Sequence, residues 1–162
     1  MLQAIVTLAS TLLHPRTVCR SGNISWRIKF SKSSIFLEIS LACDLIVRLM
    51  RAPTINQIHN LQLKHFKREL IEILKQKFVG HWYPNNPLRG TAFRSITINH
   101  CIDPVILLAA HRSSISFQLL RQYFPTEITI FIDPSEVSYR IGPTGSIDYI
   151  LSMNYNNFDS NF

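Results

Sequence analysis

The spacing of the apolar residues changes partway along this chain of 162 residues, and this change constrains the fold more than any other feature. Between residues 39 and 124 most apolar side chains recur every three or four positions, which is typical of amphipathic helices. From residue 128 they recur every second position, as in Ile128, Ile130 and Ile132, which is typical of strands. Helical segments followed by strands predict a fold of the α+β class.

The first half of this region predicts two long helices. The apolar residues between positions 39 and 49 form one stripe at helical spacing, which predicts the first helix. We expect it to end before Pro53, because the residue that precedes a proline is disfavoured in a helix. Thr54 and Gln57 have the spacing of a capping box, so a second helix is expected to open at Thr54. Gly80 can adopt the left-handed conformation that ends it.

Two shorter helices and four strands are expected after the loop at residues 81–90. Asp103 with Pro104 is typical of a helix start, and Ser116 is expected to cap the next helix. The alternating segments that predict strands of an antiparallel sheet are residues 93–98, 128–133, 137–141 and 146–150.

Phe131 is the most informative residue of these strands. If the three isoleucines beside it fill the core, the pleat directs Phe131 and Asp133 together to the other face. An aromatic residue beside a carboxylate on a solvent-facing sheet has the composition of a binding hot spot. The alternative is that helices cover both faces of the sheet. By the same alternation, Phe93 lies on the face opposite to that of Ile96 and Ile98.

Basic residues are concentrated at the N-terminus. The net charge is +7; residues 1–37 hold five basic side chains and no acidic one, whereas residues 38–162 hold 12 basic and 10 acidic ones. We expect residues 1–35 to form a basic, poorly ordered extension; the alternatives are a transit peptide and a tail that binds phosphate backbones. A secretory signal is not expected, since no basic segment precedes the apolar residues 2–13.

No arrangement of side chains predicts an enzyme, a cofactor or a metal site. Metal-binding helical spacings are absent among four of the six histidines, His65, His81, His100 and His111. His100 and Cys101 are adjacent and seldom point at each other, so Cys101 is expected to be a buried, unreactive thiol. Turn and cap chemistry explains Asp103 and Asp133.

The cysteines and the hydropathy pattern restrict the location of the protein. Cys19, Cys43 and Cys101 are odd in number and far apart, so no disulfide framework is expected, which favours a reducing, intracellular environment. Charged residues or histidines interrupt every apolar stretch before the roughly 18 residues that a membrane span needs. We expect no membrane association.

Two long segments resemble box A and box B of the BTG/Tob anti-proliferative family. They are GHWYPNNPLRGTAFRSITINHCIDP, residues 80–104, and FPTEITIFIDPSEVSYRIGPTGSI, residues 124–147. Their order, their separation and the preceding FLEISLACDLIVRLM also correspond. The resemblance implies a single BTG/Tob-type domain at residues 36–151, with several helices packed on a small antiparallel sheet, and a short polar tail at residues 152–162.

The function that the resemblance implies is that of a non-enzymatic adaptor. Such an adaptor binds the Caf/Pop-type deadenylase subunit of the Ccr-Not complex, promotes mRNA deadenylation in the cytoplasm and nucleus, and restrains proliferation. Direct sequence-specific binding of nucleic acid is not expected. The partner-binding residues carried over from the family's motifs are Phe93, Phe131, Asp133, Pro134 and Glu136.

This sequence departs from the family at both aromatic positions. Phe93 replaces a tyrosine and Phe131 replaces a tryptophan, and each loss of a polar group is expected to weaken the contact by about 1–2 kcal/mol. Two alternatives remain open. One is self-association through Phe93 and Phe131; the other is a nucleic-acid or transcription-complex binder that uses the basic N-terminus and Arg94, Arg112 and Arg140.

Overall fold

The computed structural model describes residues 35–51, 58–124 and 127–152. Within them the chain forms five helices and a four-stranded antiparallel sheet, which confirms the α+β class and the single domain with helices on a small sheet. The elements are α2 (Ile35–Arg51), α3 (Asn60–Lys77), α4 (Thr91–Arg94), β1 (Ile96–Ile98), α5 (Pro104–Arg112), α6 (Phe117–Tyr123), β2 (Ile128–Asp133), β3 (Glu136–Ile141) and β4 (Ile147–Ser152).

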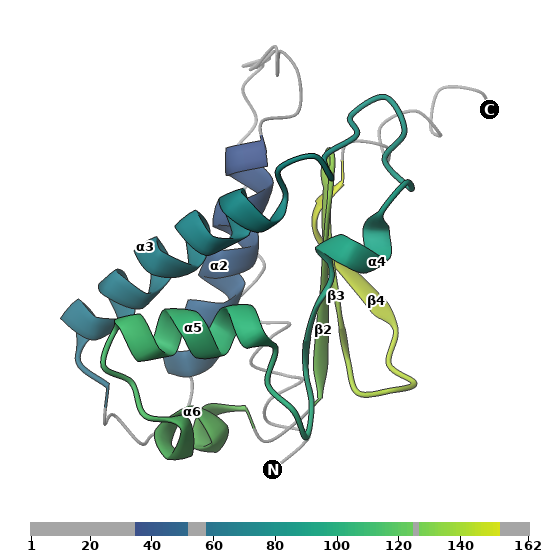
Figure 1. Ribbon diagram of the computed structural model, residues 1–162. Coiled ribbons are helices and arrows are strands. Elements are labelled where there is room, and N and C mark those ends of the chain that lie inside the picture. Colours follow the sequence, from purple (N-terminus) through teal and green to yellow (C-terminus); the bar gives the residue numbers. More distant parts are fainter. Residues whose placement is uncertain (1–34, 52–57, 125–126, 153–162) are drawn as a thin grey trace, which may run out of the picture.

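The long helices and the sheet form two layers (Figure 1). Helices α2, α3 and α5 lie together on one side of the sheet in this view, and the short α4 lies on its other side. Helix α2 packs directly on the central strands β2 and β3, and α3 packs on α2 and α5. The buried face of α2 carries apolar residues at helical spacing, which is why it fits against the sheet.

The sheet has the strand order β1-β2-β3-β4, and every neighbouring pair is antiparallel. Ile130 lies between Ile96 on β1 and Tyr139 on β3. This row is fully buried and forms the centre of the core beneath α2. The alternating isoleucines of β2 therefore face the helices, as the sequence predicts.

The predicted helix signals at three positions are confirmed. The Asp103 side chain accepts a hydrogen bond from the Val105 amide at 2.9 Å. Ser116 accepts one from the Leu119 amide at 3.2 Å. Gly80, just beyond α3, has a φ of 75°. Each residue does what its chemistry predicts at a helix end.

The predicted start of the second helix is wrong. Helix α3 begins at Asn60, and the two described residues before it, Ile58 and His59, are not helical. The amide of His59 donates to Gln62 Oε1 at 3.2 Å, which is the capping interaction that the sequence suggested for Thr54 and Gln57. Those two residues lie outside the described part of the chain.

The predicted strand at residues 93–98 is only partly correct. The strand covers Ile96–Ile98, while Thr91–Arg94 forms the single turn α4. Gly90 has a φ of 81°, and its carbonyl accepts the amides of Phe93 and Arg94 at 3.0 and 3.3 Å. The left-handed glycine starts a helical turn where alternation alone suggested an extended chain.

None of the helices in the described ranges is both long and apolar enough to cross a bilayer.

Candidate partner-binding site

Arg94 donates hydrogen bonds to the loop at residues 81–90, hereafter the 81–90 loop. The Arg94 side chain is fully buried. Nη1 donates to the carbonyls of His81 and Arg89 at 2.7 and 2.8 Å, and Nη2 donates to the carbonyl of Pro87 at 2.6 Å. Backbone carbonyls from both ends of the loop therefore converge on one guanidinium group.

The same guanidinium group is bonded to the end of β2. Nε donates to the Ile132 carbonyl at 3.0 Å and to Asp133 Oδ1 at 3.1 Å. Nη2 also donates to Asp133 Oδ1, at 2.5 Å. An arginine has five N–H groups in a rigid fork, and here each of them has an acceptor. Arg94 thus joins the 81–90 loop to residues that follow it by almost 40 positions.

The predicted outward orientation of Asp133 is wrong. The residue is 8% exposed, because its carboxylate points to Arg94. The pleat does direct Asp133 to the face opposite to the core, but a buried arginine covers it there. Turn chemistry alone was therefore an incomplete explanation of this carboxylate.

The turn that connects β2 and β3, residues 133–136, is also fixed from the helix layer. Glu38 of α2 is 1% exposed, and its Oε1 accepts the amide of Ser135 at 3.0 Å. Ser135 has a φ of 68°, a conformation that L residues rarely adopt without support. Burial raises the pKa of Glu38 above its ordinary value, although the Ser135 amide favours the charged form.

Two further predicted site residues lie in the same turn. Pro134 is buried, and Glu136 is half-buried directly across the turn from Asp133. Burial, and then the negative charge of Asp133, raise the pKa of Glu136. The predicted surface residues Asp133 and Pro134 are thus largely enclosed, and Glu136 is accessible only in part.

Phe93 is the most exposed of the five predicted residues, with 40% of its surface accessible. It stacks on His81, with ring centroids 3.9 Å apart, and Lys77 Nζ lies 5.4 Å from the centre of its ring. Phe93 lies on helix α4 and not on a strand, but its predicted orientation away from the core holds.

Phe131 lies on the sheet face that points away from α2. Its neighbours across this face are Ser138 on β3 and, beyond it, Tyr149 on β4. Phe131 is half-buried and Tyr149 is half-exposed. Because α4 packs on β2, Phe93 and Phe131 belong to two elements in direct contact. The structure therefore places all five predicted residues on α4 or at the end of the β2–β3 hairpin.

Sequence reasoning missed Arg94 and Glu38 as site residues. By spacing, Arg94 shares the face of Ile96 and Ile98, and Glu38 shares the helix face of Ala42 and Leu45, but their partners lie 39 and 97 positions away. The assignment of Arg94 to a nucleic-acid surface is wrong, because all its N–H groups are engaged inside the protein. No local signal identifies the distant carboxylate and carbonyls to which Arg94 donates.

Two other predicted features concern the thiols and the potential metal ligands. Cys101 is exposed, so the prediction of a buried thiol is wrong, whereas Cys43 is buried and burial raises the pKa of its thiol. No group of three or more potential metal ligands occurs among the described residues.

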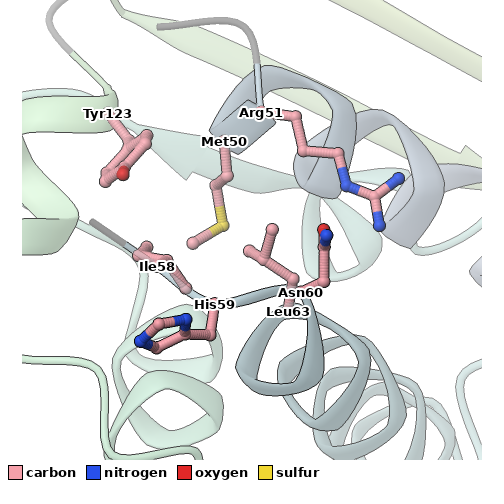
Figure 2. Close-up of a pocket in the computed structure, with 7 residues that line it drawn as sticks. All are labelled: Met50, Arg51, Ile58, His59, Asn60, Leu63 and Tyr123. Carbon is pink, nitrogen blue, oxygen red and sulfur yellow. The ribbon is translucent and has the colours of Figure 1, made fainter. Parts of the chain in front are cut away.

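A cavity of about 420 Å³ lies between the end of α2, the start of α3 and α6 (Figure 2). Its lining is Met50, Arg51, Ile58, His59, Asn60, Leu63 and Tyr123. None of the five predicted site residues lines it.

The fold is that of a BTG/Tob-type domain. The solved structure of the C. elegans FOG-3 BTG/Tob domain matches with a TM-score of 0.63 over 75% of this chain and 93% of that one, at 21% sequence identity. The sequence also matches the BTG family over residues 35–151. This chain belongs to the BTG family.

Curated relatives are similar over the same region. Chicken BTG1 is 41% identical over 118 residues, which are 73% of this chain and 68% of the relative. Human BTG1 is 41% identical over 68% of this chain and 63% of its own length. Human Tob2 is 40% identical over 68% of this chain but only 31% of its own length. Membership of the BTG family implies an anti-proliferative function.

Proposed function

We propose that this protein is a non-enzymatic anti-proliferative adaptor that binds the Caf/Pop-type deadenylase subunit of the Ccr-Not complex. By docking there in the cytoplasm and nucleus, it promotes mRNA deadenylation. The docking surface consists of Phe93 and Phe131, with Asp133, Pro134 and Glu136 beneath and beside them. This surface is hereafter the docking surface.

One observation carries the proposal. The two segments that resemble box A and box B are bonded together by Arg94, and each presents an aromatic side chain beside that bond. Partially exposed aromatic residues that are held rigidly by buried polar contacts are typical of binding hot spots. The near-neutral charge of residues 38–162 also suits an aromatic protein interface better than a phosphate backbone.

The test is binding of the full chain to the deadenylase subunit of the same organism, measured by calorimetry. Phe131→Ala and Phe93→Ala are each expected to weaken binding by about tenfold or more. Phe117→Ala is the matched control, because Phe117 is an exposed phenylalanine on α6. Circular dichroism checks that each variant is folded. Equal affinity of all four chains would refute the proposed surface.

The alternative of a nucleic-acid binder loses one of its three arginines to the interior of the protein, since Arg94 is buried. Arg112 lies 3.5 Å from Glu69 in an exposed ion pair. Binding through phosphate contacts falls steeply as salt is added, whereas an aromatic interface responds weakly. Affinity for the deadenylase subunit at two salt concentrations therefore separates the two functions.

A further inference from the structure

We propose that Arg94 is the positioning residue of the docking surface, and that Asp133 supports docking through Arg94 and not by touching the partner. The inference rests on the proposed function, because it concerns the same surface. It assigns a role to a side chain that cannot itself reach a partner, since Arg94 is fully buried.

The 81–90 loop depends on Arg94 for its shape. The backbone hydrogen bonds with both partners inside residues 81–90 are two local turns, from the Asn86 amide to the Tyr83 carbonyl and from the Arg89 amide to the Asn86 carbonyl. Three of the loop's carbonyls point inward and accept N–H groups of Arg94, namely those of His81, Pro87 and Arg89. Unpaired buried carbonyls are unfavourable, so the loop is expected to open when the guanidinium is lost.

Arg94 also contacts both members of the stacked pair Phe93 and His81. Phe93 precedes it directly in α4, and the carbonyl of His81 is one of its acceptors. The rings of Phe93 and His81 stack at 3.9 Å. A movement of the guanidinium would therefore disturb this stack and displace the Phe93 ring from the docking surface.

Asp133 is directed inward. Its Oδ1 atom accepts from both Nε and Nη2 of Arg94, and its side chain is 11% exposed. The carboxylate neutralises a buried guanidinium that has only neutral carbonyls as its other acceptors. Without that charge, the arginine would be a buried, unpaired cation, and its contacts with the loop would weaken.

The experiment uses Asp133→Asn, Arg94→Lys and the double variant in the full chain. Asparagine keeps the size of Asp133 without its charge, and lysine cannot reproduce the fork of five donors. Asp148→Asn on β4 is the matched control, since Asp148 is an exposed aspartate opposite Tyr139. The first measurement, amide exchange by NMR in the free chain, needs no partner.

Each single variant is expected to accelerate exchange of the Asn86 and Arg89 amides by about tenfold or more, and to leave the buried Leu70 of α3 unchanged. Asp148→Asn should change neither. A direct role of Asp133 at the interface predicts no effect of Asp133→Asn on the loop amides, and that result would overturn the inference. This comparison holds even if Arg94→Lys does not fold.

The second measurement is affinity for the deadenylase subunit. Asp133→Asn and Arg94→Lys should each weaken binding about tenfold, and the double variant should be no more than about twofold weaker than the weaker single variant. Losses that multiply would overturn the inference, because they would mean separate roles. Absence of binding by the wild-type chain would overturn the proposed function and with it the docking role of the pair; unchanged loop exchange would overturn the positioning role alone.

Discussion

Arg94, Asp133 and Glu38 carry ionisable groups, and all three are buried around the turn at residues 133–136. Arg94 and Asp133 form an ion pair, whereas Glu38 has one amide partner at Oε1 and no partner at Oε2 in the structure. Removing one member of a buried pair typically costs about 3–5 kcal/mol, because the other charge is left without compensation. Glu38 is different, since it can become neutral by taking up a proton.

Glu38 predicts a specific pH dependence of stability. Burial raises its pKa above 4.5 in the folded state, so folding favours the protonated carboxyl. Its contribution to stability is therefore complete below pH 4.5 and is lost as the pH rises through the raised pKa. The raised pKa of Glu136 acts in the same direction. We expect the free energy of unfolding to fall as the pH rises from 4.5 through the raised pKa values of these two groups.

Glu38→Gln tests this dependence. Glutamine keeps an acceptor oxygen for the Ser135 amide and carries no charge, so the variant should be at least as stable as the wild type near pH 8 and should show a flatter pH profile. Urea denaturation at a series of pH values measures both. Glu72→Gln, which removes a carboxylate from the exposed face of α3, should keep the wild-type profile. An unchanged slope in Glu38→Gln would contradict the assignment.

Cys101 and Cys43 are expected to differ in the reactivity of their thiols. In a Cys19→Ser background, Cys101 is exposed and Cys43 is buried. Burial raises the pKa of Cys43, which lowers its reactive thiolate fraction, and a reagent reaches it only when the protein opens. Ellman's reagent should modify Cys101 at least about 100-fold faster than Cys43. A Cys101→Ser chain that still reacts rapidly would show that α2 opens readily.

At the scale of the elements, structure that depends on local chemistry could be predicted from the sequence, whereas structure that depends on distant contacts could not. The isoleucine alternation of β2 and the caps Asp103 and Ser116 could be predicted, because periodicity and capping act within a few residues. Helix α4 could not. Residues 93–98 alternate as a strand should, but the turn starts at the left-handed Gly90 and its last residue, Arg94, bonds to Asp133, which comes 39 positions later.

The same limit applies to the site. A resemblance to box A and box B predicted Phe93, Phe131 and Asp133, and the structure brings their elements together. Alternation predicted the face on which Phe131 lies. The inward direction of Asp133 depends on a buried cation, which no pattern of apolar spacing can reveal.

Gly90 predicts a clear effect at the start of α4. Its φ of 81° is unfavourable for any side chain, and an added Cβ would lie 3.2 Å from Arg94 Nη1. Gly90→Ala should lower the free energy of unfolding by about 1–3 kcal/mol. Gly80→Ala is the matched control, since Gly80 has a φ of 75° but no atom within 4 Å of the added Cβ.

Gly80→Ala should therefore cost only the conformational part, about 1–2 kcal/mol. The difference between the two variants isolates the contact with Arg94. Urea denaturation measures both values. A loss in Gly90→Ala that equals the loss in Gly80→Ala would mean that the arginine adjusts to the added methyl group without cost.

At the scale of the whole molecule, most of the net positive charge and the described helices and strands lie in different parts of the chain. All described helices and strands lie between Ile35 and Ser152, and five of the seven net positive charges lie in residues 1–37. The two layers of helices and sheet therefore form a nearly neutral body. Nonspecific affinity for nucleic acid is expected to come from the N-terminal residues and not from this body.

Removing residues 1–34 tests this separation. The full chain should bind single-stranded RNA weakly, with a logarithmic salt slope no steeper than about −3.5 for five contacts, while residues 35–162 should show no measurable binding. Fluorescence anisotropy against salt measures both, and thermal unfolding checks that the shortened chain is folded. Undiminished binding by the shortened chain would place a basic site in the helices and sheet and would favour the nucleic-acid alternative.

Arg94 donates both to the 81–90 loop and to the end of β2, and this implies an order in which these segments fold. The β2–β3 hairpin closes over a two-residue turn, Pro134–Ser135, so its contacts are local and can form early. The 81–90 loop gains its inward donors only when the guanidinium is in place, and the charge that compensates this group sits at the end of that hairpin. We therefore expect the loop to be among the last segments to become ordered during refolding, so that a newly made chain acquires its docking surface only after its core.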